Sequence, residues 1–190
     1  MMTVHFHGGP IWGDKDSPTD MLIKALYRDG GAFISFARPE QMKKVAMFPC
    51  DIRLDNGAFS AWDKSKKKKI AVDWGRRSEK FYDFVGKWFS RIEWFLIPDV
   101  IEGSEEENDE QLELVPHWLA SKAVPVWHSD ESIERLVRLS DRYEWVAIGC
   151  CGPHRHIRSK WWEHRMNVSV QREPSGHNLK HTTKWCPPNK

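Results

Sequence analysis

Apolar residues along this chain fall into short continuous runs that alternate with stretches of helical spacing. Continuous apolar runs of this length are typical of strands buried on both faces, and apolar positions three and four residues apart are typical of helices. Strand and helix therefore alternate, which predicts an α/β fold built on a parallel sheet. The runs predict strands over residues 32–37, 93–100, 123–127 and 145–149, alternating apolar residues predict one over 50–55, and residues 3–7 form a short strand-like start.

The stretches of helical spacing lie between these strands. An acidic segment, residues 102–111, runs into a helix whose apolar side holds Leu112, Leu114, Val115 and Trp118. Residues 64–69 are nearly all lysine, which indicates either a solvated loop or a contact to the phosphates of a nucleic acid. The remaining helices are expected over residues 17–27, 39–47, 73–89 and 132–143.

Polar residues stand at the end of nearly every predicted strand. A barrel of strand-helix units would gather all of them on its carboxyl-end face, whereas a doubly wound open sheet is the alternative. The residues are His7, Ser35, Asp55, Asp99, His128 and Cys150. We favour the barrel and expect it to be an incomplete TIM-type barrel of about six units, because a complete one takes about 250 residues.

The length and composition of the chain predict one main domain. With 190 residues and 40% hydrophobic residues, the chain can bury one sizeable core. We expect this barrel-like domain to span residues 1–162. Residues 163–190 are polar and without a strand-helix period, so they are expected to form a poorly ordered tail.

Charge and cysteine content narrow the classes of function. The net charge of +2 is too small to identify a nucleic-acid binder by charge alone, so any such contact is expected from Lys64, Lys66, Lys67, Lys68 and Lys69. The 4 cysteines have neither disulfide-scaffold density nor zinc-ribbon spacing. No apolar run reaches membrane length. A cytoplasmic protein without a membrane contact or a cofactor is therefore expected.

The segment from Leu54 to Trp62 is the strongest candidate for a functional site. A predicted strand ends there in Asp55, which can move a proton, and Gly57 would let the backbone approach a flat ligand. Phe59 and Trp62 are candidates for a pocket wall. The alternative is a strand followed by an ordinary Asp-Asn-Gly turn.

Three short motifs in this chain resemble those of one enzyme family. Leu54-Asp55-Asn56-Gly57-Ala58-Phe59-Ser60 resembles the Asp-Ser-Gly-Gly-Phe-Gln strand end of the tRNA-guanine transglycosylases and their phage and DNA-modifying relatives. Ile97-Pro98-Asp99-Val100 and Val146-Ala147-Ile148-Gly149 resemble two later strand ends of that family, in the family's order. The resemblance implies a barrel that exchanges a guanine for a 7-deazaguanine base on DNA or tRNA.

The resemblance also implies roles for individual residues. Asp55 would be the catalytic, proton-transferring carboxylate. Asp99 would accept hydrogen bonds from the N1 and exocyclic amino edge of the base, and the backbone at Gly149 would meet its carbonyl oxygen. Asn56, Gly57 and Phe59, which lie in the first motif, and His128, at the end of the fifth predicted strand, are expected as further substrate-binding residues.

The chain departs from the family pattern at several positions. Ala58, Ser60 and Cys150 replace a glycine, a glutamine and a glycine, and no aspartate follows Asp141, although the family's nucleophilic aspartate lies beyond its Gly-Gly motif. The family's zinc-binding cluster near the carboxyl end is represented by Cys186 alone. We therefore expect a barrel shortened at its carboxyl end, which binds a base without full exchange activity or is completed by a partner chain.

Two other functions are compatible with the sequence. His5 and His7 lie on the same side of a predicted strand and resemble the His-x-His of metal-dependent amidohydrolases, so a hydrolytic zinc site is one alternative. His128, His154 and His156 are its further candidate ligands. The other alternative is a non-catalytic accessory protein that binds nucleic acid or a free base.

Overall fold

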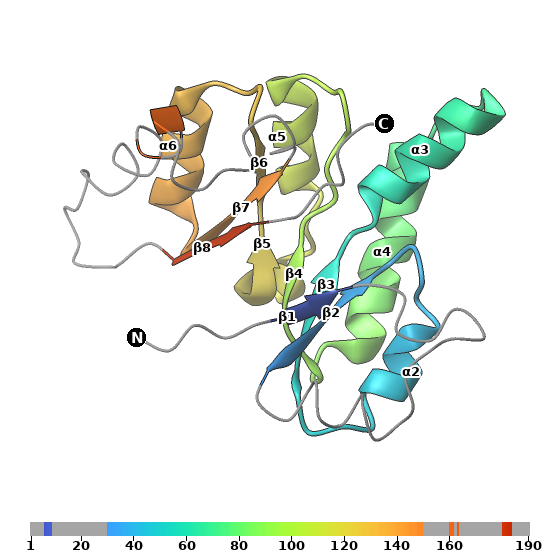
Figure 1. The fold of residues 1–190 in the computed structure, drawn as a ribbon. Helices are drawn as coiled ribbons and strands as arrows, with labels where there is room; N and C mark the ends of the chain where they lie inside the picture. The colour runs from blue at the N-terminus through green and yellow to red at the C-terminus, as the bar shows by residue number, and fades with distance from the viewer. Residues whose placement is uncertain (1–5, 9–29, 150–159, 162, 164–179, 184–190) are drawn as a thin grey trace. The chain divides into compact units, whose positions relative to one another are not determined.

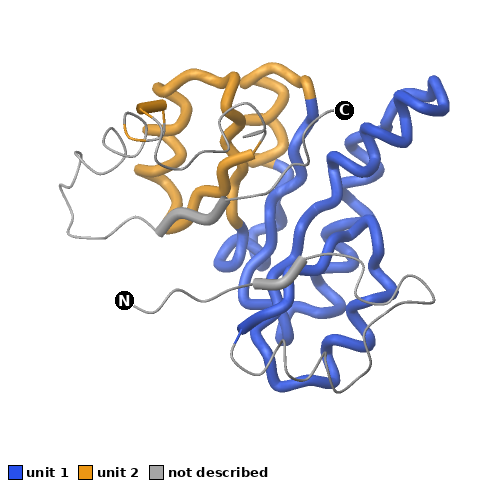
Figure 2. The backbone as a smooth tube through the Cα atoms, in the orientation of Figure 1, with its two compact units in different colours: residues 1–101, 114–123 blue, residues 102–113, 124–190 orange. Residues whose placement is uncertain are grey.

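The computed structural model describes residues 6–8, 30–149, 160–161, 163 and 180–183. Parallel strands alternate with helices along the chain, so the predicted α/β class is confirmed (Figure 1). The contacts divide the chain into two compact units, shown in separate colours in Figure 2. Unit 1 comprises residues 1–101 and 114–123, and unit 2 comprises residues 102–113 and 124–190.

The larger sheet has five strands, and their spatial order follows the chain. The first four pair in parallel with their neighbours in the chain. The five strands are β1 (Phe6–Gly8), β2 (Gly31–Ser35), β3 (Asp51–Asp55), β4 (Ile92–Leu96) and β5 (Ala123–Val124). Alternate residues of β2 and β3 are buried, including Ile34, Ile52 and Leu54 at 0% exposure, which places the core of unit 1 against this sheet.

The helices of unit 1 are α2 (Gln41–Val45), α3 (Ala58–Lys68), α4 (Trp74–Trp88) and the 3-10 helix η1 (His117–Lys122). Helix α4 begins at Asp73, whose side chain accepts a hydrogen bond from the Arg76 backbone N–H at 3.0 Å. The apolar side of α4 buries Phe81, and its ring meets Phe95 of β4 at a centroid distance of 5.9 Å. This contact joins α4 to the sheet.

Unit 2 contains a three-stranded sheet in the order β6-β7-β8, again following the chain and parallel throughout. Its strands are β6 (Val126–His128), β7 (Trp145–Gly149) and β8 (Lys180–Thr183), and its helices are α5 (Glu105–Glu113) and α6 (Ile133–Arg142). Leu136 and Leu139 of α6 are buried, as are Val146 and Ile148 of β7. These four apolar side chains belong to the core of unit 2.

Two helices differ from the prediction. Residues 58–68 form α3, where the sequence analysis predicted no helix. Lysine is a good helix former, and the Lys67–Asp63 ion pair at 2.7 Å supports the helix. The acidic segment is itself the helix α5. Ser104 and Glu107 form a capping box there, in which the Ser104 N–H donates to Glu107 at 2.8 Å and the Glu107 N–H donates to the Ser104 hydroxyl at 3.2 Å.

The predicted strand over residues 123–127 is divided. Pro125 separates β5 from β6, and the two strands belong to different sheets. The physical reason is that proline has no N–H to donate to a strand ladder, although its carbonyl accepts from the Ala147 N–H at 2.9 Å. Because the apolar residues of this segment form one continuous run, the sequence predicted a single strand.

The closed barrel is not confirmed. Consecutive strands are neighbours in both sheets, without the reversal of strand order that marks a doubly wound fold, but neither sheet closes on itself within the residues that the structure describes. Most of the expected polar tail, 163–190, lies outside those residues, although Lys180–Thr183 forms β8 beside β7. The boundary at residue 162 therefore stays a prediction. No helix in the described part of the chain is long and apolar enough to cross a membrane.

Candidate functional site

The carboxyl ends of β2 and β3 bring two predicted polar residues together. Ser35 and Asp55 are paired in the register of the two strands, and the Ser35 hydroxyl donates to Asp55 Oδ2 at 2.8 Å. The backbone N–H of Gly57 donates to the same oxygen at 3.2 Å. These two donors hold the Asp55 carboxylate in one orientation at the end of its strand.

Asn56 connects this strand end to the next one. Its side chain is buried at 1% exposure, and its amide nitrogen donates to the Ile97 carbonyl at 2.7 Å and to Asp99 Oδ1 at 2.6 Å. Its amide oxygen accepts from the Ala58 N–H at 2.8 Å. Asp99 is also buried, at 4% exposure. Asn56 therefore acts as a positioning residue that fixes Asp99 just beyond β4.

Gly57 has a backbone conformation that favours glycine. Its φ is 70° and its ψ is 20°, in the left-handed region, and it forms the N-cap of α3. A Cβ at this position would lie 2.7 Å from the Ala37 backbone nitrogen and 2.9 Å from Arg77 Nη2. The glycine thus allows three parts of unit 1 to approach one another closely.

Arg77, in the first turn of α4, was not predicted as a site residue. Its Nη2 donates to the Asn56 carbonyl at 2.8 Å, and its guanidinium lies over the Phe36 ring, 5.3 Å from the centroid. Burial lowers the pKa of Arg77, and the carboxylates of Asp55 and Asp99 act in the opposite direction. Arg77 thus supplies a positive charge beside the two aspartates. Ser35, Asp55, Asn56, Arg77 and Asp99 together are called the unit 1 cluster below.

The other predicted residues of unit 1 lie on α3. Phe59 and Trp62 pack against each other with a centroid distance of 5.4 Å. A cavity of about 440 Å³ opens beside Gly57 and Arg77, and neither aromatic ring lines it. The run Lys64–Lys69, for which the sequence left a solvated loop and a phosphate contact open, continues along this helix to its C-cap.

In unit 2, His128 and Gly149 end neighbouring strands and are register partners. A Cβ on Gly149 would lie 2.9 Å from His128 Cδ2, so the imidazole packs directly on the glycine. His128 Nδ1 lies 3.1 Å from Glu131 Oε1, and its backbone N–H donates to Glu131 Oε2 at 2.8 Å. A carboxylate at one ring nitrogen orients a histidine, as in many acid-base and ligand-binding sites.

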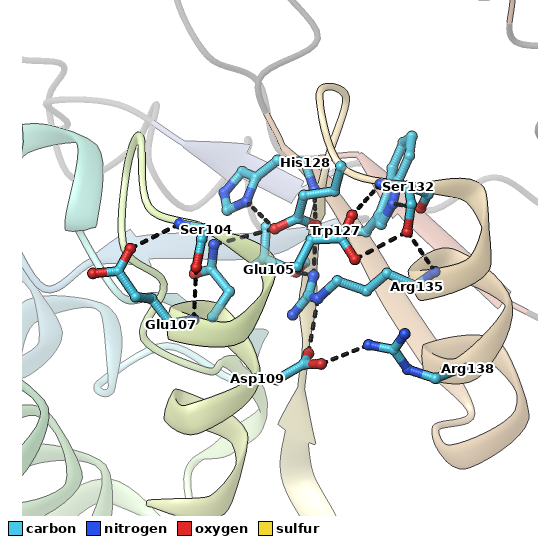
Figure 3. A network of polar contacts seen from close by, with 12 residues as sticks. Ser104, Glu105, Glu107, Asp109, Trp127, His128, Ser132, Arg135 and Arg138 are labelled. Carbon is cyan, nitrogen blue, oxygen red and sulfur yellow. Dashed lines mark hydrogen bonds and ion pairs between the residues drawn. The ribbon is translucent and has the colours of Figure 1, made fainter.

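A buried network supports this histidine (Figure 3). Arg135, at 1% exposure, donates to Glu131, to the Val126 carbonyl at 3.0 Å and to Asp109 at 2.8 Å. Arg138 donates to the other oxygen of Asp109 at 2.6 Å. Glu131 and Arg135 were not predicted as site residues. Their i,i+4 spacing on a predicted helix start is the one local signal that indicates the pair.

Most of the ligands proposed for the alternative zinc site lie outside the residues that the structure describes. No cluster of three or more histidine, cysteine or acidic residues suited to a metal occurs within the described residues. His7 lies in β1, whereas His5, His154 and His156 fall outside the residues that the structure describes, as does Cys150. The zinc prediction for these residues stays a prediction.

Comparison with protein-family models, with curated proteins and with solved structures finds no match to this chain. The resemblance to transglycosylases therefore depends on the three motifs, and the case for a site depends on the contacts described above.

Proposed function

We propose that this chain is a transglycosylase-like protein that binds a guanine or 7-deazaguanine base at the unit 1 cluster. The observation that carries the proposal is the pairing of Asn56 with Asp99 at 2.6 Å, next to Asp55 on the adjacent strand end. Guanine presents its N1 proton and its amino group side by side as donors. A carboxylate, which is acceptor-only and has two oxygens, is the natural partner for them.

The strand order supports a barrel-type architecture for this protein. In both sheets each strand lies beside the next one in the chain. The pairs β1–β2, β2–β3, β3–β4, β6–β7 and β7–β8 are parallel, as in strand-helix barrels. The unit 1 cluster lies at the carboxyl ends of β2, β3 and β4, which is where barrel enzymes place their active sites. An incomplete TIM-type barrel is therefore part of the proposal.

The contacts within the unit 1 cluster support the roles that the resemblance implies. Asp55 is oriented by two donors and is the candidate for proton transfer, while Asp99 is the candidate base-reading carboxylate, positioned by Asn56. Because the sequence has no aspartate after Asp141, the nucleophile that the family uses has no counterpart there. The proposal is therefore base recognition on DNA or tRNA, with exchange requiring a nucleophile from elsewhere. The roles of His128 and Gly149 stay predictions of the resemblance.

The test is the isosteric variant Asp99→Asn. Its side-chain oxygen still accepts from Asn56, so the fold is retained, but its amide group now faces the donors of the base. We expect the affinity for 7-deazaguanine, measured by calorimetry, to fall roughly 10-fold to 100-fold, as hydrogen bonds to a charged group contribute about 1.5–3 kcal/mol.

The matched control for this test is Asp83→Asn, an exposed aspartate on α4 in the same unit. The control should bind the base as the wild type does. Equal affinity of the Asp99→Asn protein and the wild type, or a wild type that binds neither base, would refute the proposed function.

A further inference from the structure

The cavity beside Gly57 has a strongly cationic lining. Its volume is about 440 Å³, within the range of about 300–1,000 Å³ that is usual for ligand clefts. Three of its lining residues, Lys64, Lys68 and Arg77, carry positive charge, and its lining includes no aspartate or glutamate. A hollow with three cations and no acidic group is a chemical match for an anion.

The two lysines belong to one face of α3. Ser60, Lys64 and Lys68 are spaced four residues apart, so they form one row along the helix, and all three line the cavity. Both lysines are exposed, and in the described part of the chain neither forms an ion pair with a carboxylate. Their charges are therefore available to a ligand.

The neighbouring lysines of the run have different surroundings. Lys67 pairs with Asp63 at 2.7 Å, and Lys66 lies over the Trp62 ring, 5.4 Å from its centroid. Neither lines the cavity. Of the five lysines of the run, Lys64 and Lys68 therefore line the cavity, Lys66 and Lys67 contact other residues of the same helix, and Lys69 is the C-cap of α3.

Arg77 connects the cavity to the unit 1 cluster. Its guanidinium lines the cavity and at the same time donates to the Asn56 carbonyl at 2.8 Å. Phe36, under the guanidinium, lines the cavity as well, so the lining includes an apolar ring beside a half-buried cation. A ligand in the cavity would lie next to the residues that hold Asp99.

We propose that this cavity is a subsite for a phosphate group, held by Lys64, Lys68 and Arg77. The proposal deepens the proposed function and rests on it in one respect: the phosphate would belong to the nucleotide or strand that carries the base. Phosphate is the anion that lysine and arginine bind together at nucleic-acid sites. In this arrangement the unit 1 cluster would bind the base and the cavity would bind a phosphate of the backbone.

The experiment compares two double variants that remove the same charge from the same helix. The cavity variant, Lys64→Gln/Lys68→Gln, replaces both lysines that line the cavity. Lys66→Gln/Lys67→Gln is the control. Glutamine has a helix propensity close to that of lysine, so both variants keep α3. Binding of a labelled single-stranded oligothymidylate, which contains no guanine, is measured by fluorescence anisotropy over a range of salt concentrations.

We expect the cavity variant to lose roughly tenfold in affinity at low salt. The slope of log affinity against log salt concentration should become less steep by about 1 to 2. The control should stay within about threefold of the wild type with an unchanged slope. Equal losses in the two variants would overturn the proposal. It would also be overturned if the wild type bound no oligonucleotide and bound guanosine 5′-monophosphate no more tightly than guanosine.

The source of the phosphate is distinguished by comparing guanosine 5′-monophosphate with guanosine in calorimetry. If a free nucleotide is the source, the monophosphate binds more tightly than the nucleoside and the cavity variant loses that gain. If a strand is the source, only the oligonucleotide responds to the variant. Asp99→Asn keeps Lys64, Lys68 and Arg77, so it should weaken base binding without the loss of oligothymidylate affinity expected of the cavity variant. Failure of the base site and failure of the phosphate subsite therefore give different results.

Discussion

Gly57→Ala should lower the free energy of unfolding by about 2–5 kcal/mol. A residue with a Cβ costs about 1–2 kcal/mol in the left-handed conformation that Gly57 adopts, at φ 70°. The new Cβ would also lie 2.7 Å from the Ala37 backbone nitrogen, and such overpacking costs about 1–3 kcal/mol more. Urea unfolding followed by circular dichroism measures the loss.

Gly75→Ala provides the matched control. Gly75 is in the first turn of α4, and a Cβ there would meet only Asp73 Oδ1, at 3.8 Å, which is an ordinary contact. Because alanine is favoured over glycine in a helix by about 0.5–1 kcal/mol, this variant should be as stable as the wild type or more stable. Equal stability of the two variants would contradict the close approach described at Gly57.

Arg135→Met should destabilise unit 2 by about 3–5 kcal/mol. Methionine has a similar length but leaves the buried Glu131 carboxylate, 5% exposed, without its cation, and it also leaves the Val126 carbonyl without its donor. Removing one partner of a buried ion pair is costly for this reason. Calorimetric unfolding of the whole chain measures the loss.

The control for Arg135→Met is Arg138→Met on the same helix. Arg138 pairs with the same Asp109 carboxylate, but its side chain is 57% exposed. An exposed ion pair contributes about 0–1 kcal/mol, so this variant should unfold almost as the wild type does. If the two arginine variants lost equal stability, the burial of Arg135 would not be the cause.

The sequence predicts the strands of this fold better than its helices. The apolar runs identified β2, β4 and β7, and the alternation of Ile52 and Leu54 with polar residues identified β3. Helix α3 was missed because its lysine-rich half has no apolar period, and local ion pairing and propensity stabilise it instead. Pro125, which separates β5 from β6, is visible in the sequence. The apolar residues on both sides of it nevertheless predicted one strand in one sheet.

The candidate site was predictable only in part. Asp55 and Asp99 fall at the ends of predicted strands, so their placement at strand ends followed from the strand prediction. The hydrogen bond from Asn56 to Asp99 joins residues 43 positions apart, and no local pattern reports it. Arg77 and Arg135 are amphipathic side chains on helices, where an exposed, solvated position is the ordinary expectation. Only the packed structure shows that they reach buried carbonyls and carboxylates.

The two units are interleaved in the chain, because unit 1 takes residues 114–123 and unit 2 takes residues 102–113. Lys122, in the later segment of unit 1, donates to the carbonyls of Phe89 and Ile92 at 2.8 Å and 2.6 Å. A ribosome must therefore complete η1 before unit 1 has all of its contacts, and by then α5 has already been synthesised. No single cut in the gene separates the units, so neither can be inherited or exchanged as a contiguous module.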